Sequence, residues 1–166
     1  MEQIFVRPEL CMGCMSCELA CAVRHSRGKT LVSAIMETPA PKKRLSVEME
    51  NNVKMPVPCR HCEDAPCVNE CITGCLFHDD NGFVQNDEDR CIGCWSCIMA
   101  CPFGAIARDE VRHVAIKCDR CRTLEVPACV SACPTKALVL VNVDAFARDR
   151  RKRVVLEETA ALRDRR

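Results

Sequence analysis

Aromatic side chains are scarce in this sequence. They make up 4% of the 166 residues, with one Trp and no Tyr. This scarcity argues against a large conventional hydrophobic core. A small domain with a thin core usually needs disulfides or bound metal to remain folded.

The sequence also lacks a visible targeting or membrane-spanning segment. Residues 1–8 do not combine a basic region with an apolar one, as a secretory signal would, and there is no twin-arginine leader. No apolar run approaches the roughly 18 residues that a transmembrane helix needs. We therefore expect a cytoplasmic protein without a membrane span.

Cysteine, in contrast, is abundant, with 17 residues in the chain. Such a number indicates either a disulfide framework or metal binding. Disulfides are rare in the cytosol, and an odd total does not suit a fully paired framework. The composition therefore favours metal.

Two stretches of the chain share one cysteine spacing. Residues 91–102, CIGCWSCIMACP, have the pattern C-x2-C-x2-C-x3-C-P, and residues 11–21, CMGCMSCELAC, repeat it 80 positions earlier. Bacterial ferredoxins hold cubane iron–sulfur clusters with this spacing, and the fourth cysteine binds a different cluster from the first three. Each stretch therefore requires a partner group elsewhere in the chain.

Two further cysteine groups can supply these partners. Residues 59–71, CRHCEDAPCVNEC, and residues 118–133, CDRCRTLEVPACVSAC, both end in C-x3-C. Residues 66–76, PCVNECITGCL, align with residues 128–138, ACVSACPTKAL. Because all four groups recur in pairs, the sequence predicts an internal duplication of a two-cluster unit.

The remaining sequence predicts short strands and few helices. We expect a helix over 16–23 that ends near Gly28, and an extended loop over 36–44 because of Pro39 and Pro41. Asp144 is the predicted N-cap of a basic helical tail, with residues 145–153 followed by a weakly amphipathic piece over 154–162. Strands or hairpins are expected over residues 3–6, 44–49, 53–57, 76–85, 106–114 and 137–143.

With these motifs, residues 1–145 resemble the electron-transfer subunits that carry four [4Fe-4S] clusters in multisubunit redox enzymes. Members include the small iron–sulfur subunits of carbon monoxide dehydrogenase, tungsten aldehyde oxidoreductase, formate hydrogenlyase and the molybdopterin oxidoreductases. The resemblance implies an α+β fold of two bacterial-ferredoxin-like units, related by a pseudo-twofold repetition, with one nested inside the other. The outer unit would comprise residues 1–55 and 113–143, the inserted unit residues 56–112, and the tail residues 144–166.

The resemblance also implies how sixteen cysteines are shared among the clusters. The outer unit would use Cys11, Cys14, Cys17 and Cys133 for one cluster, and Cys118, Cys121, Cys129 and Cys21 for the other. The inserted unit would use Cys59, Cys62, Cys67 and Cys101 for one cluster, and Cys91, Cys94, Cys97 and Cys71 for the other. A sequential pairing of the first group with the second, and of the third with the fourth, remains open. Zinc is the alternative metal for any C-x2-C pair.

Cys75 is the cysteine left over, and Ala137 occupies the equivalent position in the repeat. We expect a buried small side chain there and no iron ligand, with a redox-active or substitute-ligand role as the alternative. Lys117, Arg120 and Arg122 lie around the fourth cysteine group. Their charges would either favour the reduced, more negative cluster or belong to a solvated face.

With sixteen thiolates and four oxidised cores of charge +2, the formal charge of the chain falls from +1 to roughly −7. The basic residues therefore compensate for cluster charge, and we expect no nucleic-acid partner. For the basic tail we expect docking on a partner subunit or on a second copy of the chain. The tail argues against the alternative of a freestanding polyferredoxin.

The sequence contains no nucleotide-binding loop and no nucleophile–base pair, so we expect no catalytic residues. The resemblance implies a non-catalytic subunit that relays single electrons. Its partners would be a catalytic subunit that oxidises aldehyde, carbon monoxide, formate or hydrogen, and a second acceptor subunit or ferredoxin.

Overall fold

The computed structural model describes residues 2–164, and the side chains of residues 2–159. The described chain mixes short strands, short helices and one long helix. Its strands are β1 (Glu2–Val6), β2 (Leu45–Glu50), β3 (Val53–Pro58), β4 (Leu76–His78), β5 (Val84–Asn86), β6 (Ile106–Asp109), β7 (Val114–Lys117) and β8 (Leu138–Asn142). Its helices are α1 (Ser16–Arg24), α2 (Leu31–Met36), α3 (Pro66–Asn69), α4 (Ser96–Ala100), α5 (Ala128–Ser131) and α6 (Val143–Asp164), with single 3-10 turns η1 (Pro8–Leu10) and η2 (Glu88–Arg90). The predicted α+β class is confirmed.

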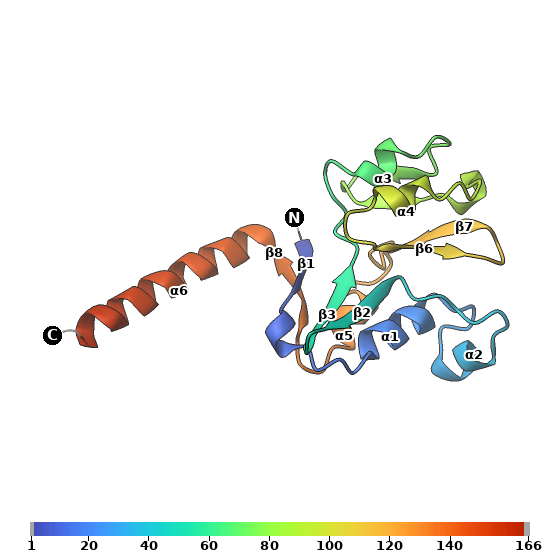
Figure 1. Ribbon diagram of the computed structural model, residues 1–166. Coiled ribbons are helices and arrows are strands. Elements are labelled where there is room, and N and C mark those ends of the chain that lie inside the picture. The colour runs from blue at the N-terminus through green and yellow to red at the C-terminus, as the bar shows by residue number, and fades with distance from the viewer. Residues whose placement is uncertain (1, 165–166) are drawn as a thin grey trace.

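The strands form four two-stranded antiparallel sheets, β1–β8, β2–β3, β4–β5 and β6–β7. Three of these are hairpins of consecutive strands, whereas β1–β8 joins the two ends of the motif-bearing region. Val6 pairs with Leu138 in that sheet, and Arg7 N–H donates to Ala137 O at 2.8 Å. Residues distant in sequence therefore lie side by side at the base of α6 (Figure 1).

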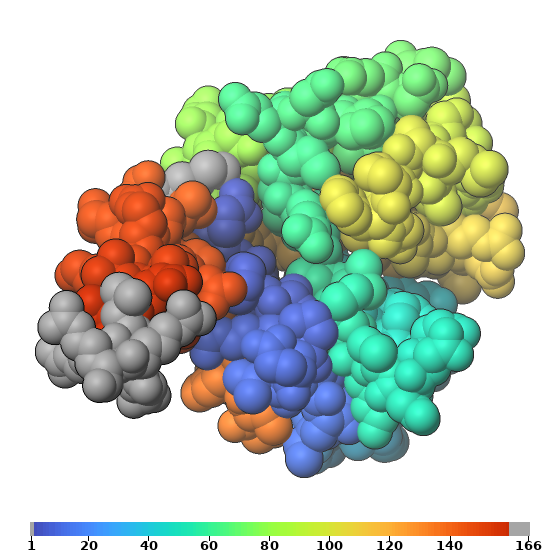
Figure 2. Space-filling model, turned by 60° about the vertical axis from the view of Figure 1, so that its left-hand side comes forward, coloured from blue at the N-terminus to red at the C-terminus, as the bar shows by residue number. Residues whose placement is uncertain are grey.

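Two separate hydrophobic clusters form the core of the described chain. The first combines buried residues from α1, β2, α5 and β8, including Leu45 and Leu138. The second comes from the middle of the chain, from α3 to β7, and includes Leu76, Val84 and Ile106. Figure 2 shows the same division, with the green and yellow middle segments above and the blue and cyan N-terminal segments below.

Helix α6 leaves the body directly after β8 and projects away from it (Figure 1). At its base, Phe146 packs against Phe5 with ring centroids 4.6 Å apart. The tail is helical as predicted, and one continuous helix spans residues 143–164. The predicted N-cap was wrong: Asp144 lies inside the first turn, and the side chain of Asn142 accepts from Ala145 N–H at 3.0 Å.

The helix predicted over residues 16–23 is confirmed as α1, which ends at Arg24, before Gly28. One other local feature differs from the prediction: α2 forms over residues 31–36, where no helix was predicted. Thr30 caps α2 by accepting from Ser33 N–H at 3.2 Å. The expected loop follows this helix and contains a cis Thr38–Pro39 bond. No helix in the described part of the chain is long and apolar enough to span a membrane.

Candidate metal centres

Left-handed backbone conformations shape the two C-x2-C-x2-C loops. Gly13 and Met15 have φ values of +74° and +58°, and Gly93 and Trp95 have +67° and +64°. Residues with a Cβ rarely adopt this conformation, so Met15 and Trp95 indicate that the backbone of each loop is tightly constrained. Helices α1 and α4 begin directly after Met15 and Trp95, which places the third cysteine of each group in the first helical turn.

One small cavity in the middle of the chain is lined by four thiols, those of Cys59, Cys62, Cys67 and Cys101. The first three precede or lie in α3, whereas Cys101 follows the last residue of α4. Burial, together with the nearby thiolates of Cys59, Cys101 and Cys62, raises the pKa of Cys67 to about 11. The Cys67 thiol therefore ionises readily only beside a positive partner, which an iron–sulfur core provides.

A second set of thiols in this region surrounds Cys97. Burial raises the pKa of Cys97 to about 11, and Cys71, Cys91 and Cys94 act in the same direction. Cys71 lies just beyond α3, so each of these two sets combines a loop from one group with a cysteine from the other. Cys94 is the exposed member of this set.

The two ends of the chain bring together the remaining predicted ligands. Burial raises the pKa of Cys129 to about 12, with further contributions from Cys21 and Cys121. Burial also raises the pKa of Cys17 to about 11, and Cys133 contributes. Of the other three predicted ligands, Cys11 packs against the same hydrophobic cluster as Cys17, Cys118 interacts with Cys129, and Cys14 is exposed. The assignment of these thiols to sets stays a prediction.

Electrostatic effects also link thiols of different predicted sets and connect these sets in a series. The thiolate of Cys17 raises the pKa of Cys129, that of Cys59 raises the pKa of Cys118, and that of Cys67 raises the pKa of Cys97. With the predicted ligand assignment, the sets containing Cys14 and Cys94 would lie at the two ends of a line. The sets containing Cys118 and Cys59 would meet in its middle.

Backbone N–H groups point at many of these sulfur atoms. The donors and sulfurs are Arg44 and Cys21 at 3.2 Å, Leu76 and Cys71 at 3.4 Å, Ala105 and Cys101 at 3.4 Å, Ala115 and Cys91 at 3.4 Å, Arg120 and Cys118 at 3.4 Å, His61 and Cys59 at 3.5 Å, and Leu138 and Cys133 at 3.5 Å. Hydrogen bonds to the sulfurs stabilise negative charge on cluster ligands and set the reduction potential. All seventeen thiols are free of disulfides, so the donor set fits iron–sulfur clusters.

Cys75 differs from the other cysteines. It is 2% exposed, and burial raises its pKa to about 12, with further contributions from Cys91 and Cys71. Its carbonyl oxygen accepts from Asp87 N–H at 2.8 Å, just as Ala137 accepts from Arg7. The predicted burial is confirmed, and the absence of a ligand role stays a prediction.

The basic residues near the fourth group do not form a single solvated face. Lys117 and Arg120 are buried, at 0% and 8% exposure, whereas Arg122 is exposed and pairs with Asp79 at 3.4 Å. His61 is also buried, and its burial, followed by the charges of Lys117 and Arg120, lowers its pKa to about 3. The motif spacing alone gave no signal of this burial.

The cavity framed by Cys59, Cys62, Cys67 and Cys101 is also lined by His61 and Lys117. Nε2 of His61 is buried and has no hydrogen-bond partner among the described residues. Orphaned buried polar atoms are uncommon in native proteins. A sulfur atom of a bound cluster would provide a partner, which further supports the fit.

The chain matches the sequence model of a 4Fe-4S dicluster domain over residues 51–160 and that of a 4Fe-4S binding domain over residues 8–24. It is 43% identical to an iron-sulfur protein of Rhodospirillum rubrum, with 95% of this chain and 88% of the relative aligned. It is 38% identical to electron transport protein HydN of Escherichia coli K12, over 88% of this chain and 93% of the relative. It is 39% identical to the thiosulfate reductase electron transfer subunit PhsB of Salmonella typhi, over 81% of this chain and 72% of the relative.

Proposed function

This chain belongs to the 4Fe-4S dicluster family, and we propose that it holds four [4Fe-4S] clusters and relays single electrons between a catalytic oxidoreductase subunit and a redox acceptor. Three relatives are named as an iron-sulfur protein, an electron transport protein and an electron transfer subunit, and these names support the proposal. The clusters supply one-electron redox chemistry when bound.

The observation that carries the proposal is the cavity lined by Cys59, Cys62, Cys67 and Cys101. It joins three thiols of one group to the last thiol of another, as the exchange of the fourth ligand requires. We propose the same exchange in each set. The four ligand sets are then Cys11, Cys14, Cys17 and Cys133; Cys118, Cys121, Cys129 and Cys21; Cys59, Cys62, Cys67 and Cys101; and Cys91, Cys94, Cys97 and Cys71.

We further propose that residues 56–112 form a unit inserted between residues 1–55 and 113–143. Separate hydrophobic clusters in the middle and at the ends of the chain support this division. Matching sheet registers also support it, since Val6 pairs with Leu138 and Asn86 pairs with Leu76. The sequential alternative lacks such support, because Cys71 interacts with Cys97 of the third group.

The residues of the chain have three tasks in this function. Their thiolates hold the iron, their backbone N–H groups stabilise the negative charge on the sulfurs, and the surrounding apolar side chains exclude water. With four thiolate ligands in each set, no iron is left open to a substrate. The protein is therefore proposed to carry electrons without catalysing a reaction itself.

Electrons are proposed to enter and leave at the ends of the line, where Cys14 and Cys94 are exposed. Exposed apolar side chains flank both thiols: Met12 and Leu19 at one end, Ile92 and Met99 at the other. Large exposed apolar side chains close together are typical of protein–protein contact sites. We propose that the catalytic subunit binds at one end and the acceptor at the other.

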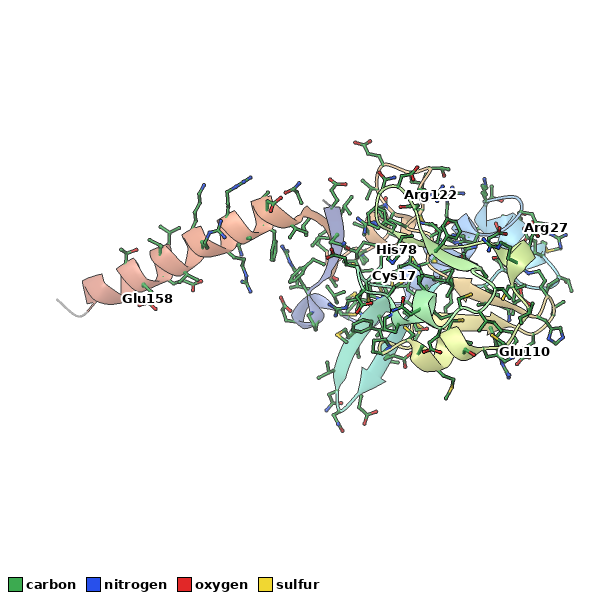
Figure 3. The ribbon with its side chains drawn as sticks, turned by 90° about the horizontal axis from the view of Figure 1, so that it is seen from above. Cys17, Arg27, His78, Glu110, Arg122 and Glu158 are labelled. Atoms are coloured by element: carbon green, nitrogen blue, oxygen red, sulfur yellow. The ribbon has the colours of Figure 1, made fainter. Side chains whose placement is uncertain are left out.

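Helix α6 is proposed to strengthen this assembly by docking on a partner subunit or on a second copy. It projects from the body, and Glu158 lies far out on it while Cys17 lies within the body (Figure 3). Val154, Val155 and Leu156 are exposed on the helix. The cytoplasmic location stays a prediction.

Anaerobic reconstitution of the full chain tests the function. We expect about sixteen irons and as many sulfides per chain, with an electron paramagnetic resonance (EPR) signal that appears on reduction. Zinc in place of iron, or a colourless and redox-silent protein, would contradict the proposal. Purification of the native protein would then identify the subunits that bind to it, and a protein that purifies alone would favour the freestanding carrier.

A further inference from the structure

Lys117, the last residue of β7, is fully buried at 0% exposure. Its Nζ donates to Val84 O at 2.6 Å and to Cys118 O at 2.9 Å, and it lies 3.4 Å from Nδ1 of His61. An ammonium group has three N–H donors and no acceptor, and two backbone carbonyl oxygens accept from it here. Lysine is almost never fully buried unless its charge is balanced.

No carboxylate balances this charge, since no Asp or Glu in the part of the chain that the structure describes forms an ion pair with Lys117. The groups near it that can become negative are thiols. Lys117 lines the cavity framed by Cys59, Cys62, Cys67 and Cys101. Its contact with Cys118 O places it beside the set containing Cys118 as well.

One ammonium group therefore lies between the cavity framed by Cys59, Cys62, Cys67 and Cys101 and the backbone carbonyl of Cys118. His61, whose Nδ1 lies 3.4 Å from Nζ, donates its backbone N–H to Cys59 Sγ at 3.5 Å. On the other side, the backbone N–H of Arg120 donates to Cys118 Sγ at 3.4 Å.

We propose that Lys117 is a positioning residue that holds a fixed positive charge between the two middle clusters and stabilises the reduced state of both. This inference rests on the proposed function. Reduction adds one negative charge to a cluster, and a nearby cation in a medium of low dielectric constant favours that charge strongly. Because one charge acts on both middle clusters, an electron experiences a similar electrostatic potential on either of them.

The neighbouring cations differ from Lys117 in their surroundings. Arg120 is buried, but its guanidinium donates to Glu2 O at 2.6 Å and stacks on Phe83 at 4.7 Å. Its charge acts on Cys118 and Cys129, which belong to a single set. Arg122 is exposed and paired with Asp79, so water screens its charge. Removal of the charge of Lys117 should therefore shift the reduction potentials of two clusters. Removal of the charge of Arg120 should shift one, and removal of that of Arg122 should shift none.

The test is an EPR-monitored redox titration of the full reconstituted chain. Lys117→Gln removes the charge and retains amide donors, while Lys117→Met approximates the length of the side chain without donors. In both variants we expect the equilibrium constant for reduction to fall about tenfold at two of the four clusters, which equals about 59 mV for a one-electron couple. Arg120→Gln should shift one cluster, and Arg122→Gln, the matched control, should shift none by more than about twofold.

Several results would overturn the inference. One is a wild-type iron content in both Lys117 variants with unchanged potentials, and another is an equal shift at all four clusters. Loss of iron from both variants would mean that Lys117 maintains the fold and does not tune the potential. Wild-type protein with far fewer than about sixteen irons would instead refute the proposed function itself, so the two failures are distinguishable.

Discussion

Arg7 and Ala137, which lie near opposite ends of the motif-bearing region, are joined by a backbone hydrogen bond of 2.8 Å. Asp87 and Cys75 form the same bond with the same length in the middle of the chain. Each bond lies beside an antiparallel strand pair, β1–β8 or β4–β5. A buried leucine follows each acceptor residue, Leu138 in one case and Leu76 in the other.

These two leucines provide a matched stability test. Leu138 is 0% exposed and Leu76 is 2% exposed, and they belong to different hydrophobic clusters. Leu138→Ala and Leu76→Ala should each lower the free energy of unfolding by about 2–5 kcal/mol, because each leaves a cavity in a thin core. Anaerobic denaturant titration of the holo protein measures this.

The control for these variants is Leu124→Ala, since Leu124 is 40% exposed. It should change the free energy of unfolding by less than about 0.5 kcal/mol. If neither core variant were less stable than this control, the two hydrophobic clusters would not carry the fold.

Cys75 and Cys71 should respond differently to removal of the thiol. Cys75→Ala should keep the wild-type iron content, because Ala137 fills the equivalent position in the repeat. Cys71→Ala should lose about one cluster, or roughly four irons, since we propose Cys71 as a ligand. Iron and sulfide analysis of the two variants in parallel decides the matter. A loss of iron from Cys75→Ala equal to that from Cys71→Ala would make Cys75 a ligand.

Asp109 predicts a pH dependence of stability. Burial alone would raise the pKa of this carboxyl, but hydrogen bonds from Arg112 and Val111 outweigh it and hold the pKa below its usual value. A lowered folded-state pKa means that the carboxylate stabilises the fold above its unfolded pKa of about 3.9, and that this contribution disappears as the pH falls below that value.

Asp109→Asn should therefore cost about 1 kcal/mol at pH 7, because Arg112 loses one of its two carboxylate partners and keeps only Glu88, while remaining half exposed. The difference between wild type and variant should shrink as the pH approaches about 3. The sign of this pH dependence is tested by measuring the free energy of unfolding across this pH range. Iron content is followed in the same samples. A difference that grew on acidification would contradict it.

Removal of residues 147–166 tests the role of α6. The truncated chain keeps Phe146, which packs on Phe5, so we expect unchanged iron content. Binding to the partner subunit, or self-association, should weaken by at least about tenfold, measured by analytical ultracentrifugation of the native complex. Loss of iron on truncation would make the helix part of the fold, and unchanged assembly would exclude it as a docking element.

Much of the fold follows from local sequence signals. The hairpin around Asn81 and Gly82 and the strand pair over residues 45–58 form as predicted, because turn residues and short apolar stretches specify them locally. The predicted strands over residues 3–6 and 137–143 are confirmed as β1 and β8, although neither segment alone identifies its partner. That pairing depends on contacts between distant parts of the chain.

The errors have similar causes. Asn142 and Asp144 are both acceptable helix caps, and only the path of β8 decides that Asn142 is used. Helix α2 depends on the Thr30 cap and on packing of Ala34, in a stretch without strong periodicity. The burial of Lys117 follows from the packing of the β5 and β7 segments, which no spacing of cysteines reveals.

Coulometric titration of the anaerobically reconstituted chain tests the central claim most directly. Four [4Fe-4S] clusters that each accept one electron predict an uptake of about four electrons per chain, with about sixteen irons and reversible return on oxidation. An uptake near two electrons, or none, would contradict an account in which all four thiol sets hold redox-active clusters.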